Sequence, residues 1–163
     1  MNTSKNNVAL VTGASDGIGA EFVEILAGRG YDLILVARRE EKLNELAVRL
    51  RRKFGVECTV MAADLSEPKA AQNLFQRIED RGLQVNFLIN NAGLLHNGFF
   101  ANLSLEAQEK MIQVNVLALT ALTHLYAAKM SSNGGGHILN VASLAGWMAI
   151  PNQNVYAASK AYV

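Results

Sequence analysis

The chain has 163 residues, of which 50% are hydrophobic and 18% are charged, which is the composition of an ordinary globular protein with a sizeable core. Fifteen basic and fourteen acidic residues leave a net charge of +1. This balance gives no electrostatic basis for binding nucleic acid or an anionic membrane surface, so we expect a small molecule as the partner.

Short apolar runs alternate with longer amphipathic stretches along the chain. The apolar runs predict buried parallel strands over residues 7–12, 31–37, 56–62, 85–90 and 137–143. The amphipathic stretches predict helices over residues 17–29, 40–53, 67–81 and 105–130, with Ser66 and Ser104 as N-caps and Pro68 in a first turn. This alternation predicts an α/β fold in which one domain, residues 1–163, forms a doubly wound parallel sheet.

Sequence features also bear on the compartment. The start of the chain, MNTSKNNVAL, lacks the long apolar run of a signal peptide. Cys58 is the only cysteine, and we expect it to be a buried strand thiol in a reducing compartment. The most apolar helical segment, residues 114–128, is interrupted by polar side chains and is interpreted as a core helix. These features favour the cytoplasm.

Five short motifs stand directly after the predicted strands. They are TGASDGIG (residues 12–19), ARR (37–39), ADL (63–65), NNAG (90–93) and NVAS (140–143). In open parallel sheets, ligands bind beyond the carboxyl ends of the strands. The motifs therefore predict a ligand site at this edge of the sheet.

The glycines of TGASDGIG have the spacing and context of a dinucleotide-binding turn. Gly13 permits a tight turn, Gly17 lets the backbone approach a pyrophosphate, and Gly19 allows close packing of the following helix. The phosphates would then meet the positive end of the helix dipole. Glycine-rich turns between a strand and a helix also occur for structural reasons alone, so the other motifs have to decide.

Together TGASDGIG, NNAG, Ser143 and YAASK (residues 156–160) resemble the short-chain dehydrogenase/reductase family in its single-domain form. The resemblance implies a Rossmann fold and an oxidoreductase that transfers a hydride between a nicotinamide cofactor and a carbonyl or alcohol substrate. It implies that Asp64 bonds the adenine and that Asn91 supports the adenosine half of the cofactor and the central strand. The full set of cofactor-binding residues that it implies is Gly13, Ser15, Gly17, Ile18, Gly19, Arg38, Asp64, Asn91, Ala92, Gly93, Tyr156 and Lys160.

The residues after the second strand bear on the choice of cofactor. An enzyme that uses NAD would place an acidic side chain there, whereas this chain has Arg38 and Arg39. A guanidinium suits a 2′-phosphate, so NADP(H) is favoured over NAD(H). Alternatively, both arginines only begin a solvated helix rich in charge pairs. Family members that use NADP often carry a basic residue in the glycine loop, where this chain has Asp16.

The catalytic group is predicted from YAASK. A tyrosine with a pKa near 10 is a poor base unless its phenolate is stabilised. Tyr156 and Lys160 are four residues apart, so on one helix they share a face where the ammonium favours the phenolate. The resemblance makes Tyr156 the proton donor or acceptor, gives Lys160 a second contact to the nicotinamide ribose, and lets Ser143 hold the substrate oxygen. It also assigns Asn115 to position a water, although a buried asparagine can simply satisfy a backbone group.

The three histidines have no metal-ligand spacing, so no metal is expected.

Apolar side chains follow the fourth and fifth strands in LLHNGFF (residues 94–100) and LAGWMAIPNQN (residues 144–154). They indicate either an apolar substrate pocket or the closure of the core beneath the loops.

The end of the sequence limits these expectations. Family members continue past the Tyr–Lys helix with a further strand and a substrate-covering segment, and they form homo-oligomers through their fourth and fifth helices. We therefore interpret this chain, which ends at Val163, as the amino-terminal part of a reductase with its fifth strand left as a sheet edge. The alternative is a non-catalytic dinucleotide-binding or interaction module.

Overall fold

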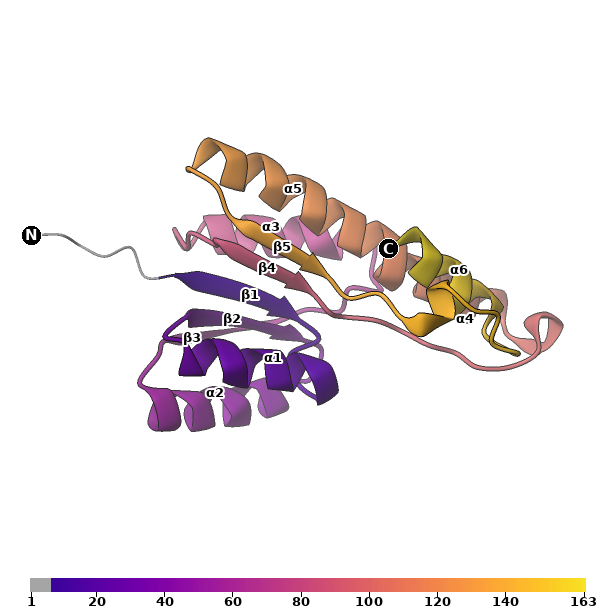
Figure 1. The fold of residues 1–163 in the computed structure, drawn as a ribbon, viewed down its shortest axis with the longest axis horizontal. Helices are drawn as coiled ribbons and strands as arrows, with labels where there is room; N and C mark the ends of the chain where they lie inside the picture. The colour runs from indigo at the N-terminus through magenta and orange to yellow at the C-terminus, as the bar shows by residue number, and fades with distance from the viewer. Residues whose placement is uncertain (1–6) are drawn as a thin grey trace, which may run out of the picture.

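A five-stranded parallel sheet forms the centre of the computed structural model, which describes residues 7–163 (Figure 1). The strands are β1 (Val8–Thr12), β2 (Asp32–Ala37), β3 (Cys58–Ala62), β4 (Phe87–Asn90) and β5 (His137–Asn140). Their order in the sheet is β3-β2-β1-β4-β5, and every pair is parallel. The order reverses between β1 and β4, so the predicted doubly wound sheet is confirmed and its switch point lies at these two strands.

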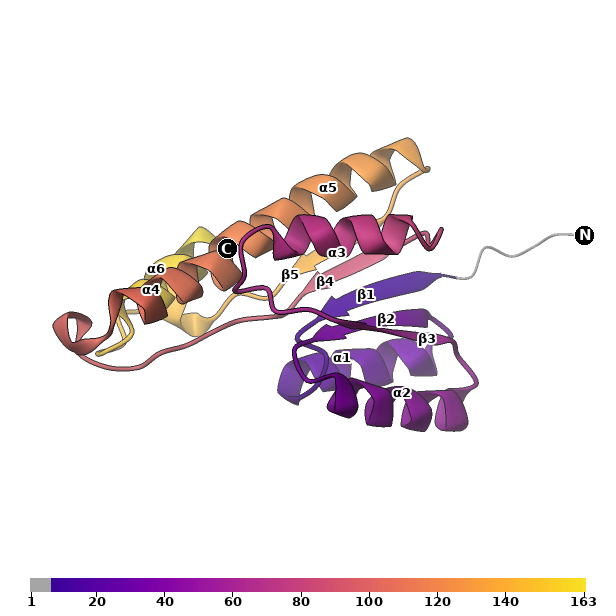
Figure 2. The same cartoon turned by 180° about the vertical axis from the view of Figure 1, so that it is seen from behind.

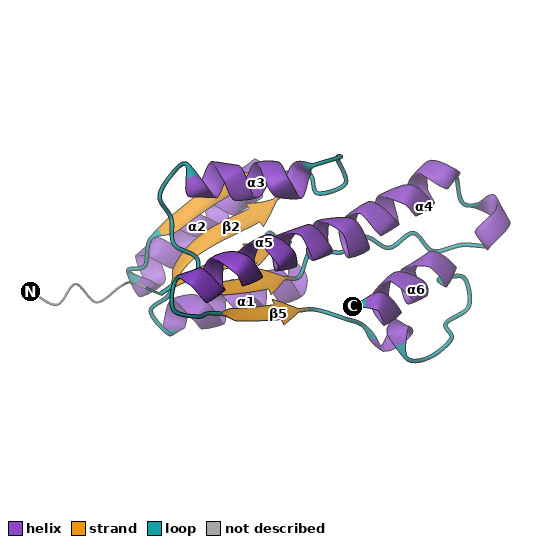
Figure 3. Ribbon diagram, turned by 90° about the horizontal axis from the view of Figure 1, so that it is seen from above, coloured by secondary structure: helices purple, strands orange, loops and turns teal. Residues whose placement is uncertain are grey.

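Helices cover both faces of the sheet. One face carries α1 (Gly17–Gly28) and α2 (Glu40–Phe54), and the opposite face carries α3 (Ala70–Glu79) and α5 (Leu119–Ser132), which lie side by side (Figure 2). Beyond the carboxyl ends of the strands lie α4 (Leu105–Ile112) and α6 (Asn154–Tyr162) (Figure 3). Three short helices complete the described chain: η1 (Phe100–Asn102), η2 (Gln113–Ala118) and η3 (Leu144–Gly146).

The core has two layers because the central strands are buried on both faces. Ala9 and Val11 of β1 pack with α1 and α2, while Leu10 between them packs with α3 and α5. All three residues are fully buried, which explains why this strand is apolar throughout instead of alternating with polar residues. Burying a valine or leucine side chain contributes about 1.5–3 kcal/mol, so both layers stabilise the sheet under the site.

A single long helix runs from Leu105 to Ser132 and contains a π turn, η2, between α4 and α5. Its predicted N-cap is confirmed, because the Ser104 side chain accepts a hydrogen bond from the Ala107 amide at 3.2 Å. By length and composition alone the helix could cross a membrane. In the structure its α5 part packs against α3 and β4, and 39% of the most apolar 18-residue window of the helix is buried.

The prediction for the start of α3 is wrong. The Ser66 amide and hydroxyl both donate to Oδ1 of Asp64, at 2.9 and 2.7 Å, so Ser66 belongs to a turn after β3 and caps no helix. Pro68 precedes Lys69, whose φ of 61° is left-handed and cannot belong to a helix. The helix therefore begins at Ala70, after this turn.

Two expectations about strands are confirmed. Cys58 lies in β3 and is buried, and this burial raises the pKa of its thiol to about 11. As expected, β5 stands at an edge of the sheet, the other edge being β3, and its His137 and Leu139 are exposed. The expectation that no signal peptide is present concerns residues 1–6 as well, which lie outside the described part of the chain.

Candidate active site

The glycine loop, residues 13–17, joins β1 to α1, and it brings the backbones of Gly13 and Gly19 into close contact. Gly13 has a φ of +66°, which a residue with a side chain rarely adopts. A Cβ atom on Gly19 would stand 2.1 Å from the Gly13 carbonyl oxygen, so only glycine fits there. At Gly17 nothing lies within 4 Å of the corresponding position, which leaves the loop backbone open to a ligand. The tight turn and the close helix packing are confirmed.

Side chains at the ends of β1 and β4 tie these two strands together. The Thr12 hydroxyl accepts from the amides of Asn91 and Ala92, at 3.1 and 3.0 Å. In return, Nδ2 of Asn91 donates to the carbonyls of Thr12 and Gly13, at 3.1 and 3.2 Å. Asn91 therefore supports the central strand, while its part in cofactor binding stays a prediction. Sequence reasoning missed Thr12, although a hydroxyl that ends a buried apolar strand signals a partner nearby.

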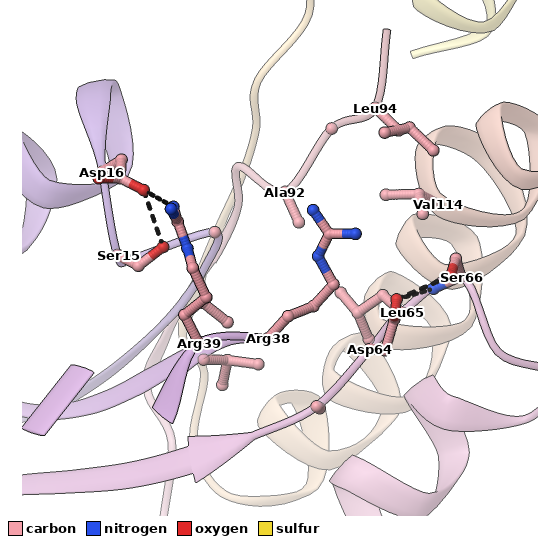
Figure 4. A pocket seen from close by; sticks show the side chains of 15 residues that line it. Ser15, Asp16, Arg38, Arg39, Asp64, Leu65, Ser66, Ala92, Leu94 and Val114 are labelled. Atoms are coloured by element: carbon pink, nitrogen blue, oxygen red, sulfur yellow. Dashed lines mark hydrogen bonds and ion pairs between the residues drawn. The ribbon is translucent and has the colours of Figure 1, made fainter. Parts of the chain in front are cut away.

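A cavity of about 200 Å³ lies beyond the carboxyl ends of these strands (Figure 4). Its walls come from the glycine loop, the turn after β2, residues 63–66 after β3, and residues 92–94 after β4. Among the predicted cofactor-binding residues, those that line it are Gly13, Ser15, Arg38, Asp64, Ala92 and Gly93. Gly17, Ile18 and Gly19 stand at the start of α1, outside this lining.

The charged side chains Arg38 and Asp64, which both line this cavity, differ in their hydrogen bonds. Arg38 points toward Ala92 and Leu94 (Figure 4), and within residues 7–163 it forms no hydrogen bond or ion pair. Burial raises the pKa of Asp64, but hydrogen bonds from Ser66 and the charge of Arg38 outweigh it and hold the pKa below its usual value. Asp64 is therefore a carboxylate that can accept further hydrogen bonds.

Helix α6 holds Tyr156 and Lys160 on one face, as predicted. The Lys160 Nζ atom lies 5.9 Å from the centroid of the Tyr156 ring. It donates a hydrogen bond to the carbonyl of Val141 at 2.8 Å, just past the end of β5. Lys160 is only 6% exposed, and this burial lowers the pKa of its ammonium group.

Asn115 connects the loop after β4 to α6 from within the π turn. It is fully buried, and it exchanges hydrogen bonds with the backbone of Leu94: Oδ1 accepts at 2.8 Å and Nδ2 donates at 2.9 Å. Nδ2 also donates to the Ser159 hydroxyl at 2.9 Å, which in turn donates to the carbonyl of Tyr156 at 2.7 Å. Asn115 thus satisfies a backbone segment, and the water-positioning role stays a prediction. Sequence reasoning missed Ser159, whose place three residues after Tyr156 signals a bond within the helix.

The turn after β5 packs closely on α6. A Cβ atom on Gly146 would stand 2.7 Å from the Lys160 carbonyl carbon and oxygen, so η3 and α6 meet at backbone distance. Ser143 directly precedes η3 and accepts from the Ala145 amide at 3.2 Å. On the other side, a Cβ atom on Gly93 would stand 3.6 Å from Nζ of Lys160. The ends of β4 and β5 therefore meet around Lys160.

The family follows from the comparison with known proteins. The short chain dehydrogenase model matches residues 7–163, which is the whole of the described chain. The chain belongs to the short-chain dehydrogenase family. A 7beta-hydroxysteroid dehydrogenase of Collinsella aerofaciens is 37% identical over 154 residues, which cover 94% of this chain and 58% of that protein. A very-long-chain 3-oxoacyl-CoA reductase of Phaeosphaeria nodorum is 39% identical over 160 residues, which cover 95% and 47%. The chain thus spans about half the length of these short-chain dehydrogenases.

Solved structures of dehydrogenases superpose on nearly the whole chain. A short-chain dehydrogenase from Sphingobium yanoikuyae in complex with NADPH matches with a TM-score of 0.90 and 38% identity, over 96% of this chain and 61% of that one. A bulky-bulky ketone specific alcohol dehydrogenase from Comamonas testosteroni matches with a TM-score of 0.90 and 35% identity, over 96% and 63%. The fold and the family are therefore those predicted from the motifs.

Proposed function

We propose that this chain binds NADP(H) and catalyses hydride transfer between the nicotinamide and a carbonyl or alcohol substrate. The position of Gly93 carries the proposal. Gly93 lines the cavity formed by the glycine loop and Arg38, and it also lies against Nζ of Lys160. The predicted cofactor pocket and the predicted catalytic residues therefore adjoin.

The residues present fit a dinucleotide. The cavity is smaller than the roughly 300–1,000 Å³ of pockets that enclose a whole drug-sized ligand, and its size suits the adenosine end of a cofactor. The open backbone at Gly17 stands at the amino-terminus of α1, where the helix dipole favours a pyrophosphate. From there a bound dinucleotide would continue past Gly93 toward Lys160. The complex of the Sphingobium yanoikuyae relative with NADPH supports this assignment.

Arg38 supports NADP(H) as the preferred form. Its guanidinium points into the cavity and forms no hydrogen bond or ion pair among the described residues, so it can bind a phosphate without first breaking one. The alternative, in which both arginines only begin a solvated helix, suits Arg39, which is the N-cap of α2.

The catalytic residues have the bonding capacity that the reaction needs. When bound, the cofactor donates or accepts the hydride. Tyr156 gives a proton to the substrate oxygen in reduction and takes one in oxidation. The Ser143 oxygen already accepts from Ala145, which leaves its hydrogen free to bond the same substrate oxygen. Lys160 donates one of its three hydrogens to Val141, so two remain for the ribose and for Tyr156.

The loops beside this cluster indicate an apolar substrate. Several of their apolar side chains are exposed instead of packed into the core, among them Phe99 at 70%, Leu144 at 75% and Trp147 at 91%. A hydrogen bond from the Gly98 amide to the Asn152 carbonyl, 3.0 Å long, ties the two loops together. Residues 94–103 and 141–159 contain no Asp, Glu, Lys or Arg. We therefore propose a bulky apolar ketone or alcohol, a class that the names of the relatives also support.

The test is Tyr156→Phe in the whole protein, with Tyr162→Phe as the control. Tyr162 lies on the same helix but is 58% exposed, and its hydroxyl bonds Thr120. We expect Tyr156→Phe to slow the NADPH-dependent reduction of an apolar ketone at least about 100-fold, the contribution of general acid catalysis, and Tyr162→Phe to leave it unchanged. Wild-type turnover in Tyr156→Phe would refute the acid/base role. NADPH binding without reduction of any ketone by the wild type would favour the non-catalytic module instead.

A further inference from the structure

An ion-pair cluster bridges the glycine loop and α2 at the mouth of the cavity. Oδ2 of Asp16 accepts a hydrogen bond from Nη2 of Arg39, and its Oδ1 accepts one from Nζ of Lys42 at 3.1 Å. The Ser15 hydroxyl also donates to Oδ2 of Asp16, at 3.2 Å. Asp16 and Arg39 both line the cavity, so this cluster forms part of its wall (Figure 4).

The two arginines after β2 therefore differ in their availability to a ligand. Arg38 points into the cavity and makes no ion pair within residues 7–163. Arg39 is held at Asp16, on the glycine-loop side (Figure 4). A phosphate in the cavity meets one guanidinium that has no ion pair to break, that of Arg38, and a second one, that of Arg39, which is already paired with a carboxylate.

The Asp16 carboxylate opposes a phosphate in two ways. It competes with the phosphate for Arg39, and it repels the phosphate as a like charge in the same cavity. A ribose hydroxyl experiences neither penalty, because it is neutral and can donate to a carboxylate. The effect of Asp16 thus depends on whether the ligand carries the phosphate.

We propose that Asp16 is a specificity-determining residue that restrains Arg39 and so limits the preference of this chain for NADP(H) over NAD(H). This inference rests on the proposed cofactor function. It assigns the phosphate contact to Arg38 and makes Arg39 a second contact that Asp16 withholds.

The chain offers a control in a second ion-pair cluster, which joins α1 to α2. Glu24 of α1 pairs with Arg49 of α2 at 3.0 Å and with Lys53 of α2 at 3.1 Å, so it too is a carboxylate bound to an arginine and a lysine. Glu24 does not line the cavity. Glu24→Gln therefore removes the same charge and a similar bridge without altering the site.

The experiment is calorimetric titration of the protein with adenosine 2′,5′-bisphosphate and with adenosine 5′-monophosphate. We expect Asp16→Asn to tighten binding of the bisphosphate about two- to fivefold, the range expected from one exposed ion pair, and to leave the monophosphate unchanged. Glu24→Gln should change neither affinity. When Arg39 is already replaced in Arg39→Ala, Asp16→Asn should give a smaller gain, because the competition for that guanidinium is gone.

Each other outcome refutes the inference. Unchanged or weaker binding of the bisphosphate in Asp16→Asn would show that Asp16 does not oppose the phosphate. An equal gain for both ligands, or an equal gain in Glu24→Gln, would show a general charge effect. If the wild type binds neither ligand, the proposed cofactor function fails and the inference fails with it. Binding of both with an unchanged ratio in Asp16→Asn refutes the role of Asp16 alone.

Discussion

Replacing Gly19 by alanine tests whether the glycine loop is set by backbone contact. The added methyl group would stand 2.1 Å from the Gly13 carbonyl oxygen, 2.5 Å from Nδ2 of Asn91 and 2.8 Å from the Gly13 carbonyl carbon. Two of these atoms are backbone and cannot rotate away. The substitution must therefore move the loop from α1 or push Asn91 out of its place.

The size of the effect follows from opposing contributions. Alanine gains about 0.5–1 kcal/mol over glycine within a helix. Overpacking a closed site costs about 1–3 kcal/mol. Displacing Asn91 also weakens its hydrogen bonds to the carbonyls of Thr12 and Gly13, each contributing about 0.5–1.5 kcal/mol. We expect Gly19→Ala to lower the free energy of unfolding by about 2–4 kcal/mol in total.

The assay is urea denaturation, with Gly28→Ala as the control. Gly28 ends the same helix, and a Cβ atom there would meet only Cε1 of Phe54, at an ordinary 3.5 Å. Gly28→Ala should leave the stability unchanged or raise it by up to about 1 kcal/mol. If Gly19→Ala were as stable as Gly28→Ala, the loop and α1 would not be held at this distance, and the explanation of Gly19 by close packing would be wrong.

Two further predictions concern α6. Ser159→Ala should lower the free energy of unfolding by about 1–3 kcal/mol, because it leaves one N–H of the buried Asn115 amide without an acceptor; a loss below about 0.5 kcal/mol in urea denaturation would contradict this. Lys160→Met should exceed the wild type in free energy of unfolding by the largest margin near neutral pH, because burying the charged ammonium destabilises the wild type there. Because the folded pKa of Lys160 is lowered, the unfolded chain binds the extra proton, so the wild type should recover stability relative to Lys160→Met as the pH rises toward 10.5; a pH-independent difference would refute it.

The sequence predicted the sheet because its central strands, β1, β2 and β4, are buried on both faces and form continuous apolar runs. It failed at the start of α3, where Ser66 has the right residue type for a helix cap. The hydrogen bonds from Ser66 to Asp64 form a turn instead, and Lys69 then takes a left-handed conformation. Residue type alone does not distinguish these two uses of a serine, since its hydroxyl can accept a hydrogen bond from a helix amide or donate one to a nearby carboxylate.

For the candidate site, the motifs indicated which residues to examine but not how they bond. Asn115 and Ser159 are 44 positions apart, so their hydrogen bond depends on how α6 packs against the long helix. The pairing of Asp16 with Arg39 is likewise a contact across 23 positions. From sequence, Asp16 only looked like a departure from the NADP pattern. In the structure Asp16 forms ion pairs with Arg39, the N-cap of α2, and with Lys42 in α2.

The π turn at η2 sets the phase between the two halves of the long helix. It holds one residue more per turn than an α-helix, and one residue corresponds to about 100° of rotation. The buried positions keep a helical spacing of three or four residues from Met111 in α4 to Leu122 in α5, so the π turn changes the direction in which they face along the helix. The rotation lets α4 turn its buried side to α6 while α5 keeps its own on the sheet. The π turn thus allows one continuous helix to pack against α6 at one end and against the sheet at the other.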